Sequence, residues 1–318
     1  MSRKNGRSDR MQQAKRTLQI YLWIQTLGVI AWWALLFGYP PAVKWFQPAS
    51  FPEAALTSFW LPDFVCIVTG GAFTLWAIHR QPAVVTPLLW AVTAAVFYPT
   101  LYCLFVSLMT DEGWLASAVM SLMSGAMLTL LLIQGVGDQQ MAAFRPARLT
   151  ARQALLWTLL QMALFWGLFL YVIPQAIDEV AIQLGWQRFE HVGQPLLAIA
   201  LFVAASSIGL RSAYHMSMVG KGTPLPTATP PRLIVRGPYR YVRNPMAIAG
   251  IAQGIAVGWY LGSPWVICYA MLGVILWHLL VRPVEEHDLQ KRFGDAHTRY
   301  RCRVPVWIPR GWRSGKES

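Results

Sequence analysis

The sequence predicts an all-α polytopic membrane protein, a bundle of about eight transmembrane helices whose N- and C-termini are cytoplasmic. Three observations predict this fold: the composition, the lengths of the apolar segments and the placement of the basic residues. Hydrophobic residues make up 55% of the 318 positions and charged residues only 13%. Because soluble domains carry about 25% charged residues, this composition excludes an ordinary soluble domain and favours one embedded in a bilayer.

Eight apolar segments are long enough to cross the hydrocarbon core of a bilayer, which takes about 20 helical residues. We place them at residues 17–38, 58–79, 84–109, 114–135, 153–174, 194–213, 244–262 and 264–281. Only Thr110–Gly113 separates the third from the fourth, which predicts a tight turn between antiparallel helices. Pro174 marks the predicted end of the fifth span, whereas Pro245 and Pro264 fit the first turns of the last two helices.

The basic residues set the predicted orientation, because Lys and Arg gather in cytoplasmic loops. With the N-terminus inside, only Lys44 and Arg188 of the 27 basic residues fall on the outer side, together with acidic residues such as Asp111 and Glu190. The other basic residues border apolar segments, so the net charge of +13 predicts contact with anionic lipid headgroups of the bilayer and no nucleic acid partner. The compact basic loops indicate a bacterial inner (cytoplasmic) membrane and an active site facing the cytoplasm.

We expect three parts along the chain. Residues 1–16 form a basic cytoplasmic arm without fixed structure, residues 17–213 a membrane scaffold of six helices, and residues 214–318 the part that carries chemistry. Four prolines within residues 221–231 predict an extended loop in the third part. Within the spans, polar amides are interpreted as groups that hydrogen-bond between helices. These amides belong to Gln25, Gln134 and Gln161.

Basic and aromatic side chains alternate just before the seventh span. They are Arg236, Tyr239, Arg240, Tyr241 and Arg243. They either anchor the helix at the membrane surface or form a ligand site. Gly237-Pro238 and Asn244-Pro245 favour a rigid, turned backbone, and Asn244 caps a helix whose N-terminal amides suit a carboxylate or phosphate. Gly250 lets a ligand or a neighbouring helix approach closely.

A second charged group follows the eighth span. Arg282, Glu285 and Glu286 lie at helical spacings of three and four, so both acids can face the arginine. This is either an exposed salt bridge of little energetic value or a functional group at membrane depth. Together, the two charged segments predict a site for a zwitterionic, nucleotide-like cofactor that opens to the bilayer. Nucleotide-binding and hydrolase motifs of soluble folds are absent from the sequence, and no metal site is predicted.

Several short motifs resemble the isoprenylcysteine carboxyl methyltransferase family of integral membrane enzymes, which belongs to a wider group that includes phospholipid and thiol methyltransferases. The resemblance covers roughly residues 215–310. The motifs are Lys221–Pro224, Leu233–Tyr239, Tyr241–Pro245, Arg282-x-x-Glu-Glu286, Phe293-Gly294, Tyr300 and Arg303–Pro309. The motifs are short, but their order and spacing together are specific.

The resemblance implies that S-adenosylmethionine binds at the cytosolic ends of the last two helices. The implied cofactor residues are Leu233, Ile234, Tyr239, Asn244, Pro245, Met246, Ala247 and Glu286. Arg282 would face the methyl acceptor, so Arg282 and Glu286 are the candidate catalytic residues. We add Arg243 for the cofactor's carboxylate, Glu285 with Glu286 for its positive end, and Gly250 for close approach. Asn244 and Ala247 replace the family's His and Tyr, so contacts with adenosine must differ there.

The expected function is S-adenosylmethionine-dependent methyl transfer to a lipophilic or small membrane-partitioned acceptor, a carboxylate, thiol or amine. Two alternatives stay open: a membrane NADPH-dependent reductase of the sterol-reductase type, which has a similar hairpin, and a non-enzymatic membrane protein. The six N-terminal spans exceed what the hairpin needs. They form either an acceptor tunnel or the interface of a homo-oligomer.

Overall fold

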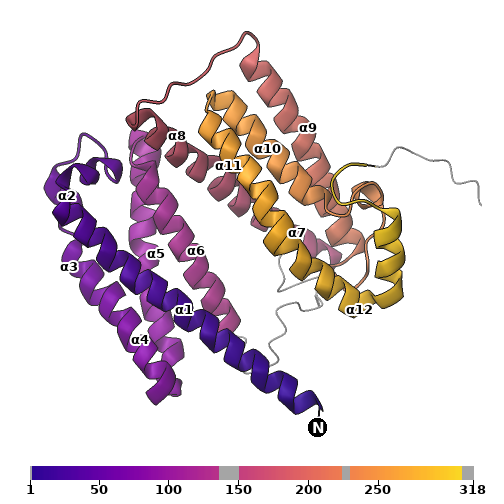
Figure 1. Cartoon of the computed structure of the whole chain (residues 1–318), viewed down its shortest axis with the longest axis horizontal. Coiled ribbons are helices and arrows are strands. Elements are labelled where there is room, and N and C mark those ends of the chain that lie inside the picture. The colour runs from indigo at the N-terminus through magenta and orange to yellow at the C-terminus, as the bar shows by residue number, and fades with distance from the viewer. Residues whose placement is uncertain (1, 136–149, 224–229, 310–318) are drawn as a thin grey trace, which may run out of the picture. The chain divides into compact units, whose positions relative to one another are not determined.

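The computed structural model describes residues 2–135, 150–223 and 230–309, and every regular element in these ranges is helical (Figure 1). Seven helices in these ranges are long and apolar enough to cross a membrane. The 17-residue helix Pro245–Leu261 corresponds to the remaining predicted span. The predicted fold class is therefore confirmed. The chain divides into two compact units, Met1–Ala142 and Ala143–Ser318, so the fifth and sixth spans pack with the last two. The functional division predicted at residue 213 stays a prediction.

The N-terminal unit is a bundle of four long helical segments. Its elements are α1 (Ser2–Gly38), η1 (Pro40–Trp45), α2 (Glu53–Thr57), α3 (Trp60–Pro62), η2 (Asp63–Val68), α4 (Thr69–Arg80), η3 (Pro82–Val84), α5 (Val85–Thr110) and α6 (Trp114–Gly135). The predicted tight turn is present, since α5 ends at Thr110 and α6 begins at Trp114. Asp111 and Gly113 make this turn in left-handed conformations.

The basic arm expected without fixed structure is helical from Ser2 onward, which corrects the prediction. Its Arg, Lys and Gln residues are good helix formers, and extending an existing helix costs far less than nucleating a new one. The arm therefore continues the first span toward its N-terminus. The predicted role of this arm at the membrane surface stays a prediction.

The C-terminal unit begins with a helix that does not stop at Pro174 as predicted. α7 (Ala151–Phe165), the π-helical turn η4 (Trp166–Val172) and α8 (Ile173–Gln183) follow one another without a break. Pro174 lies in the first turn of α8, directly after the π-helical turn. A wider turn accommodates the proline ring and its missing N–H donor, so the helix continues past it.

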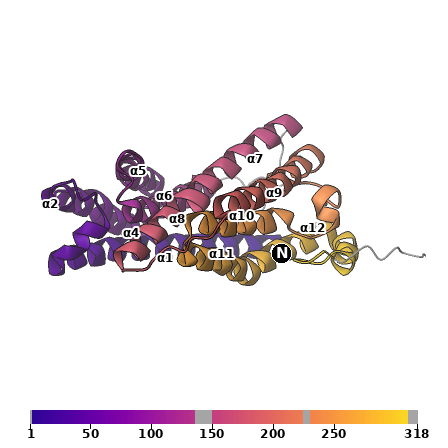
Figure 2. The same ribbon diagram turned by 90° about the horizontal axis from the view of Figure 1, so that it is seen from above.

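Three further helices pack side by side in this unit. They are α9 (Gln194–Tyr214), α10 (Pro245–Leu261) and α11 (Pro264–Leu276), with α10 between its two neighbours (Figure 2). Small residues allow the close approach: a Cβ atom added to Gly254 would lie 3.0 Å from the Ala270 Cβ atom. Gln253 of α10 also donates a hydrogen bond to Ser206 of α9, at 2.8 Å. Gly262 ends α10 in the left-handed region, as the predicted break between the two spans requires.

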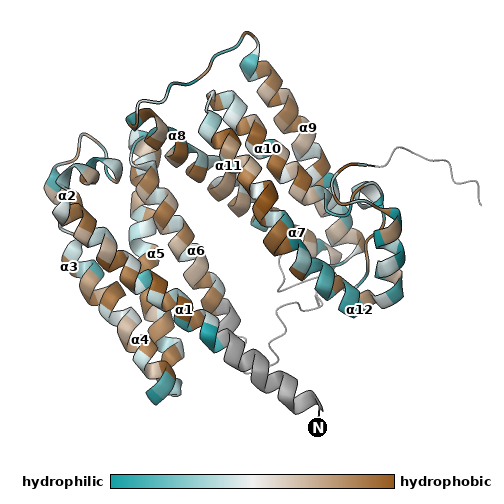
Figure 3. Ribbon diagram, viewed as in Figure 1, coloured by the Kyte–Doolittle hydropathy of each residue, from teal (hydrophilic) through white to brown (hydrophobic). Residues whose placement is uncertain are grey.

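The remaining elements of the unit join these helices to a hydrophilic cap. They are η5 (His215–Val219), η7 (Gly237–Arg240), η8 (Trp277–Val281) and α12 (Arg282–Arg303). Hydrophobic residues give way to hydrophilic ones where η8 meets α12, and the ribbon changes there from brown to teal (Figure 3). Gly294 interrupts α12 with a φ of 48° and a ψ of −123°, so the chain bends there. Part of the Pro-rich loop predicted over residues 221–231, residues 224–229, lies outside the described residues.

Candidate functional site

The two charged segments singled out in the sequence meet in the structure. Arg243, before α10, places its Nη1 atom 2.8 Å from Glu286 Oε1 on α12. Asn244 Nδ2 donates a hydrogen bond of 3.2 Å to Glu285 Oε2. Residues about 40 positions apart thus form one charged cluster at the N-terminal end of α10. The predicted convergence is confirmed, whereas the roles assigned to these residues stay predictions.

Asn244 uses both the oxygen and the nitrogen of its side-chain amide at the start of α10. Its Oδ1 atom accepts a hydrogen bond from the Ala247 amide at 3.1 Å, which confirms the predicted helix cap. Its amide nitrogen meanwhile holds Glu285. An asparagine at this position can therefore cap the helix and orient a carboxylate at once. Pro245 follows in the first turn and is buried, and the other candidate positions on this turn, Met246, Ala247 and Gly250, are partly buried.

Arg282 interacts with only one of the two acids that its spacing allows. Its Nη1 atom lies 3.9 Å from Glu286 Oε1, and its Nε atom donates to the His278 carbonyl at 3.3 Å. Glu285 is turned to Asn244 instead. Glu286 therefore lies between two guanidinium groups, those of Arg243 and Arg282. Glu285 pairs with no arginine among the residues that the structure describes, so the two acids are electrostatically different.

Two other segments, η5 and α12, contact the loop that precedes α10. Ile234 and Tyr239 are buried and Leu233 is partly buried. Gly237 has a φ of 62°, and the His215 ring occupies the space that a side chain there would need. The C-terminal part of α12 bends back over the same loop. Its Tyr300 hydroxyl donates to the Tyr239 carbonyl at 2.7 Å.

Several buried polar atoms in this unit have no hydrogen-bond partner among the described residues. Among them are the Tyr239 hydroxyl, Arg243 Nε, His215 Nδ1 and His297 Nε2. Buried polar atoms without partners are rare in folded proteins. Tyr239 and Arg243 lie in the candidate cofactor segment, His215 contacts the same segment at Gly237, and the charges of Glu286 and Arg243 both affect His297. This arrangement fits a polar ligand that brings donors and acceptors of its own.

Burial also changes the ionisation of the cluster. It raises the pKa of Glu285 to about 7, an effect that the neighbouring Glu286 charge increases and the Asn244 hydrogen bond opposes. Burial lowers the pKa of Arg243, while the ion pair with Glu286 opposes this. Burial lowers the pKa of His297 as well, so its ring favours the neutral form. With a pKa of about 7, Glu285 can occur both protonated and ionised near neutral pH.

The structure adds residues that the sequence reasoning did not single out. His215 and His297 belong to the group with unpartnered atoms, and Trp307 donates from Nε1 to His278 Nδ1 at 3.0 Å. No local sequence pattern links His215 to Gly237, because their contact depends on the tertiary fold. Neither histidine lies within ten residues of Arg243, Arg282 or Glu286 in the sequence, so no helical spacing links it to the charged cluster.

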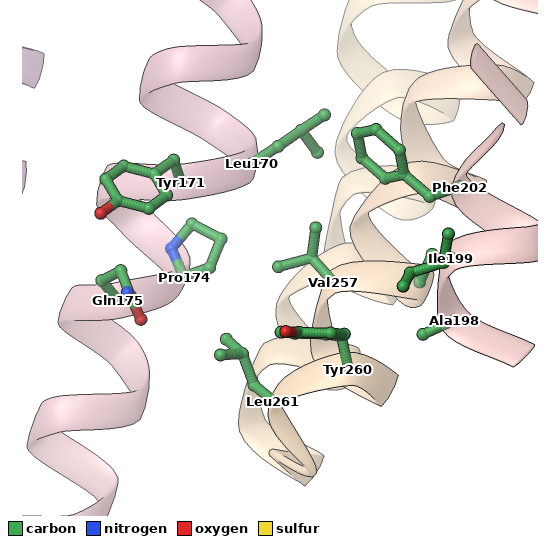
Figure 4. Close-up of a pocket in the computed structure, with 11 residues that line it drawn as sticks. Leu170, Tyr171, Pro174, Gln175, Ala198, Ile199, Phe202, Val257, Tyr260 and Leu261 are labelled. Carbon is green, nitrogen blue, oxygen red and sulfur yellow. The ribbon is translucent and has the colours of Figure 1, made fainter. Parts of the chain in front are cut away.

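An apolar groove of about 290 Å³ lies further along α10 (Figure 4). Tyr171 and Pro174 form one wall, Val257 and Tyr260 of α10 face them, and Phe202 of α9 closes one side. Ala247 and Val257 are ten residues apart, about 15 Å along a helix. The groove is therefore too far from Asn244 to hold reacting atoms beside the charged cluster. It can hold only an apolar extension of a ligand.

Comparison with family models matches residues 193–296 to the phospholipid methyltransferase family. The comparisons with curated proteins and with solved structures gave no match. The matched range begins at the start of α9 and includes Arg243, Asn244, Arg282, Glu285 and Glu286. It therefore contains the whole charged cluster and the helical hairpin on which the sequence resemblance rests. Residues 193–296 are thus similar to the phospholipid methyltransferase family, and this match agrees with the family resemblance seen in the sequence motifs.

Proposed function

We propose that this protein is an integral membrane methyltransferase that uses S-adenosylmethionine and methylates a lipophilic acceptor. One observation carries the proposal: the charged cluster of Arg243, Asn244, Glu285 and Glu286 includes or adjoins buried polar atoms without partners among the described residues, such as Arg243 Nε and the Tyr239 hydroxyl. A ligand with a carboxylate, an ammonium group and ring nitrogens would supply what this site lacks. S-adenosylmethionine has all three.

When bound, S-adenosylmethionine supplies a methyl group on a sulfonium, which a nucleophile displaces in line. The residues of this chain position the reactants. Arg243 holds a carboxylate through its guanidinium, whereas Glu286 balances positive charge next to it. Asn244 fixes Glu285, and Tyr239 lines the site below the bent-back α12. Such a reaction depends mainly on alignment in a site from which water is excluded, and the α12 cap provides this exclusion.

Arg282 and Glu285 are the residues nearest to these groups that can act on the acceptor. Arg282 pairs with Glu286 only at 3.9 Å, so it can turn to an anionic acceptor. A carboxylate or thiolate needs no base, whereas an amine must lose a proton first. Glu285, with a pKa of about 7 caused by burial, is suited to accept that proton. The apolar groove along α10 would hold the acceptor's chain.

The charges favour this cofactor over NADPH, the cofactor of the alternative reductase. NADPH carries several phosphate charges, and two carboxyl groups line the cluster beside its two arginines. Glu286 already pairs with both guanidinium groups. A polyanion would therefore compete with a carboxylate that belongs to the protein and cannot leave the site. S-adenosylmethionine brings a single carboxylate and a net positive charge, so it meets less opposition from the two acids.

Thermal unfolding of the purified full chain in detergent tests the proposal. We expect S-adenosylmethionine and its demethylated product, S-adenosylhomocysteine, to raise the melting temperature, and NADPH to leave it unchanged. Glu286→Ala should abolish the shift, whereas Asp295→Asn, which changes an exposed acid on the same helix, should retain it. Incubation with tritiated S-adenosylmethionine and a lipid extract then tests transfer, which Arg282→Ala should reduce. Stabilisation by NADPH alone would overturn the proposal in favour of a reductase.

A further inference from the structure

The N-terminal unit contains a cavity that lies outside the family match. Its volume of about 510 Å³ falls within the range of roughly 300–1,000 Å³ that is usual for small-molecule sites. Its walls come from α1, η2, α5 and α6, and the segment between α1 and α3 closes one end. Almost all of the wall is apolar. Nothing in the proposed methyl transfer uses this cavity.

One face of α1 forms a wall of the cavity. Tyr21, Gln25, Gly28, Val29 and Trp32 lie on this face at helical spacing and all line the cavity. A Cβ atom added to Gly28 would have no atom within 4 Å. The absence of a side chain at Gly28 therefore enlarges the cavity. No neighbouring helix approaches closely enough to require a glycine there.

Gln25 is the anomaly in this wall. The residue is 4% exposed, and neither its Nε2 nor its Oε1 atom has a hydrogen-bond partner in the part of the chain that the structure describes. The interhelical hydrogen bond expected from the sequence is therefore not present. Other polar residues of the wall are satisfied: Tyr21 donates to the Met123 carbonyl, Ser107 pairs with Ser117, and Asp63 accepts from Trp33. An unsatisfied buried amide is costly, and its place in a cavity wall points to a partner inside the cavity.

Water is a poor candidate for that partner, because a buried water needs two to four polar contacts and Tyr21, Asp63 and Ser107 of the wall are already paired. The exposed residues of the wall show how another molecule could enter. Ile24, Tyr102, Val119 and Leu122 line the cavity and are exposed, and all four lie in membrane-spanning helices. These residues face the hydrocarbon core of a bilayer, so the molecule that reaches the cavity most readily is a lipid.

We propose that the cavity binds a neutral long-chain alcohol, with its chain along the apolar wall and its hydroxyl group on Gln25. A hydroxyl both donates and accepts hydrogen bonds, so one group of this kind satisfies the amide Oε1 and Nε2 atoms together. Asp63 is the charged residue of the wall, and the wall contains no basic side chain. A fatty acid anion would meet this carboxylate without a compensating cation, which favours a neutral head.

The test uses the purified full chain in nanodiscs and a hexadecanol that carries a photoreactive diazirine in its chain. We expect crosslinks in peptides that contain Met120 or Cys103, which line the cavity. An excess of plain hexadecanol should prevent them, whereas hexadecane and palmitate should compete much less. Gln25→Leu keeps the size of the side chain and removes its polar atoms, and we expect it to weaken competition by hexadecanol about tenfold, the value of one hydrogen bond.

Gly28→Leu fills the cavity and should abolish the crosslinks. Gly125→Leu is the matched control, since Gly125 also has open space around it and does not line the cavity. It should label like the unmodified chain. Equal competition by hexadecane and hexadecanol, or full labelling of both Gln25→Leu and Gly28→Leu, would overturn the proposal. The competition experiment on the unmodified chain decides the matter even if a variant does not fold.

Discussion

Replacing Arg243 by Ala should weaken ligand binding far more than it weakens the fold. Arg243 Nη1 lies 2.8 Å from Glu286 Oε1, and Arg282 Nη1 lies 3.9 Å from the same atom. At an effective dielectric constant of about 20, these distances correspond to attractions of about 6 and about 4 kcal/mol before desolvation. Arg282 therefore leaves Glu286 with a partner after Arg243 is removed. We expect a loss of about 1–2 kcal/mol in unfolding free energy, below the 3–5 kcal/mol typical of an orphaned buried charge.

In ligand binding, by contrast, we expect no other residue to replace Arg243. If Arg243 holds the carboxylate of S-adenosylhomocysteine, its removal deletes a charge-assisted hydrogen bond worth about 1.5–3 kcal/mol. This corresponds to a Kd raised about 10- to 150-fold. Isothermal titration calorimetry with S-adenosylhomocysteine measures the change directly. Arg240→Ala is the control, because Arg240 belongs to the same loop but is exposed and stacks on Tyr241; its Kd should stay within about twofold.

A double-mutant cycle with Glu286→Ala then separates a ligand contact from an indirect effect. Residues in direct contact are expected to show an interaction energy of about 0.5–3 kcal/mol. We therefore expect the double variant to lose less binding energy than the sum of the two single variants. The reasoning is refuted if Arg243→Ala binds S-adenosylhomocysteine as well as the unmodified chain does, or if the two losses simply add.

Three other perturbations probe the same unit. Tyr300→Phe should lower the unfolding free energy by about 1–3 kcal/mol, because it leaves the buried Tyr239 carbonyl without its donor; Tyr241→Phe, at an exposed ring, should be silent in the same thermal scan. Gly294→Ala should cost about 1–3 kcal/mol, since φ of 48° with ψ of −123° suits only glycine; the helical Gly273→Ala should not destabilise. Burial raises the Glu285 pKa from 4.5 to about 7, so the folded state binds the proton more tightly than the unfolded state. Stability should then fall as pH rises from 4.5 to 7, and Glu285→Gln should flatten that slope in pH-dependent melting curves.

The span positions could be predicted because a bilayer imposes one length and one polarity on every crossing. Thr110–Gly113 illustrates this: four polar or small residues between two long apolar runs leave room only for a turn, and the structure has one there. Pro174 shows where the reasoning is insufficient. A proline predicts a helix end from local sterics, but the π-helical turn before it removes the clash. That turn depends on packing around Trp166–Val172, which a single sequence does not display.

The candidate site, too, was predictable in part from the sequence. The spacing of Arg282, Glu285 and Glu286 on one helix predicted that they share a face, and the approach of Arg243 and Asn244 followed from the hairpin. Which partner each of the two acids contacts could not be predicted. Spacing treats Glu285 and Glu286 alike, yet Asn244 holds the first and two arginines hold the second. His215 was missed because its contact with Gly237 joins segments whose relation depends on the tertiary fold.

Part of the groove that we propose for the acceptor's chain lies outside the family match. Residues 193–296 contain the charged cluster, so this part of the proposal rests on both geometry and family. One wall of the apolar groove, however, consists of Tyr171 and Pro174, which precede the matched range. The π-helical turn before Pro174 sets the position of that wall. Because substrate selection depends on the shape of the site that receives the substrate, the family match alone does not identify the acceptor of this chain. If our proposal is right, the acceptor's chain fits the groove that η4 and α8 form with α9 and α10.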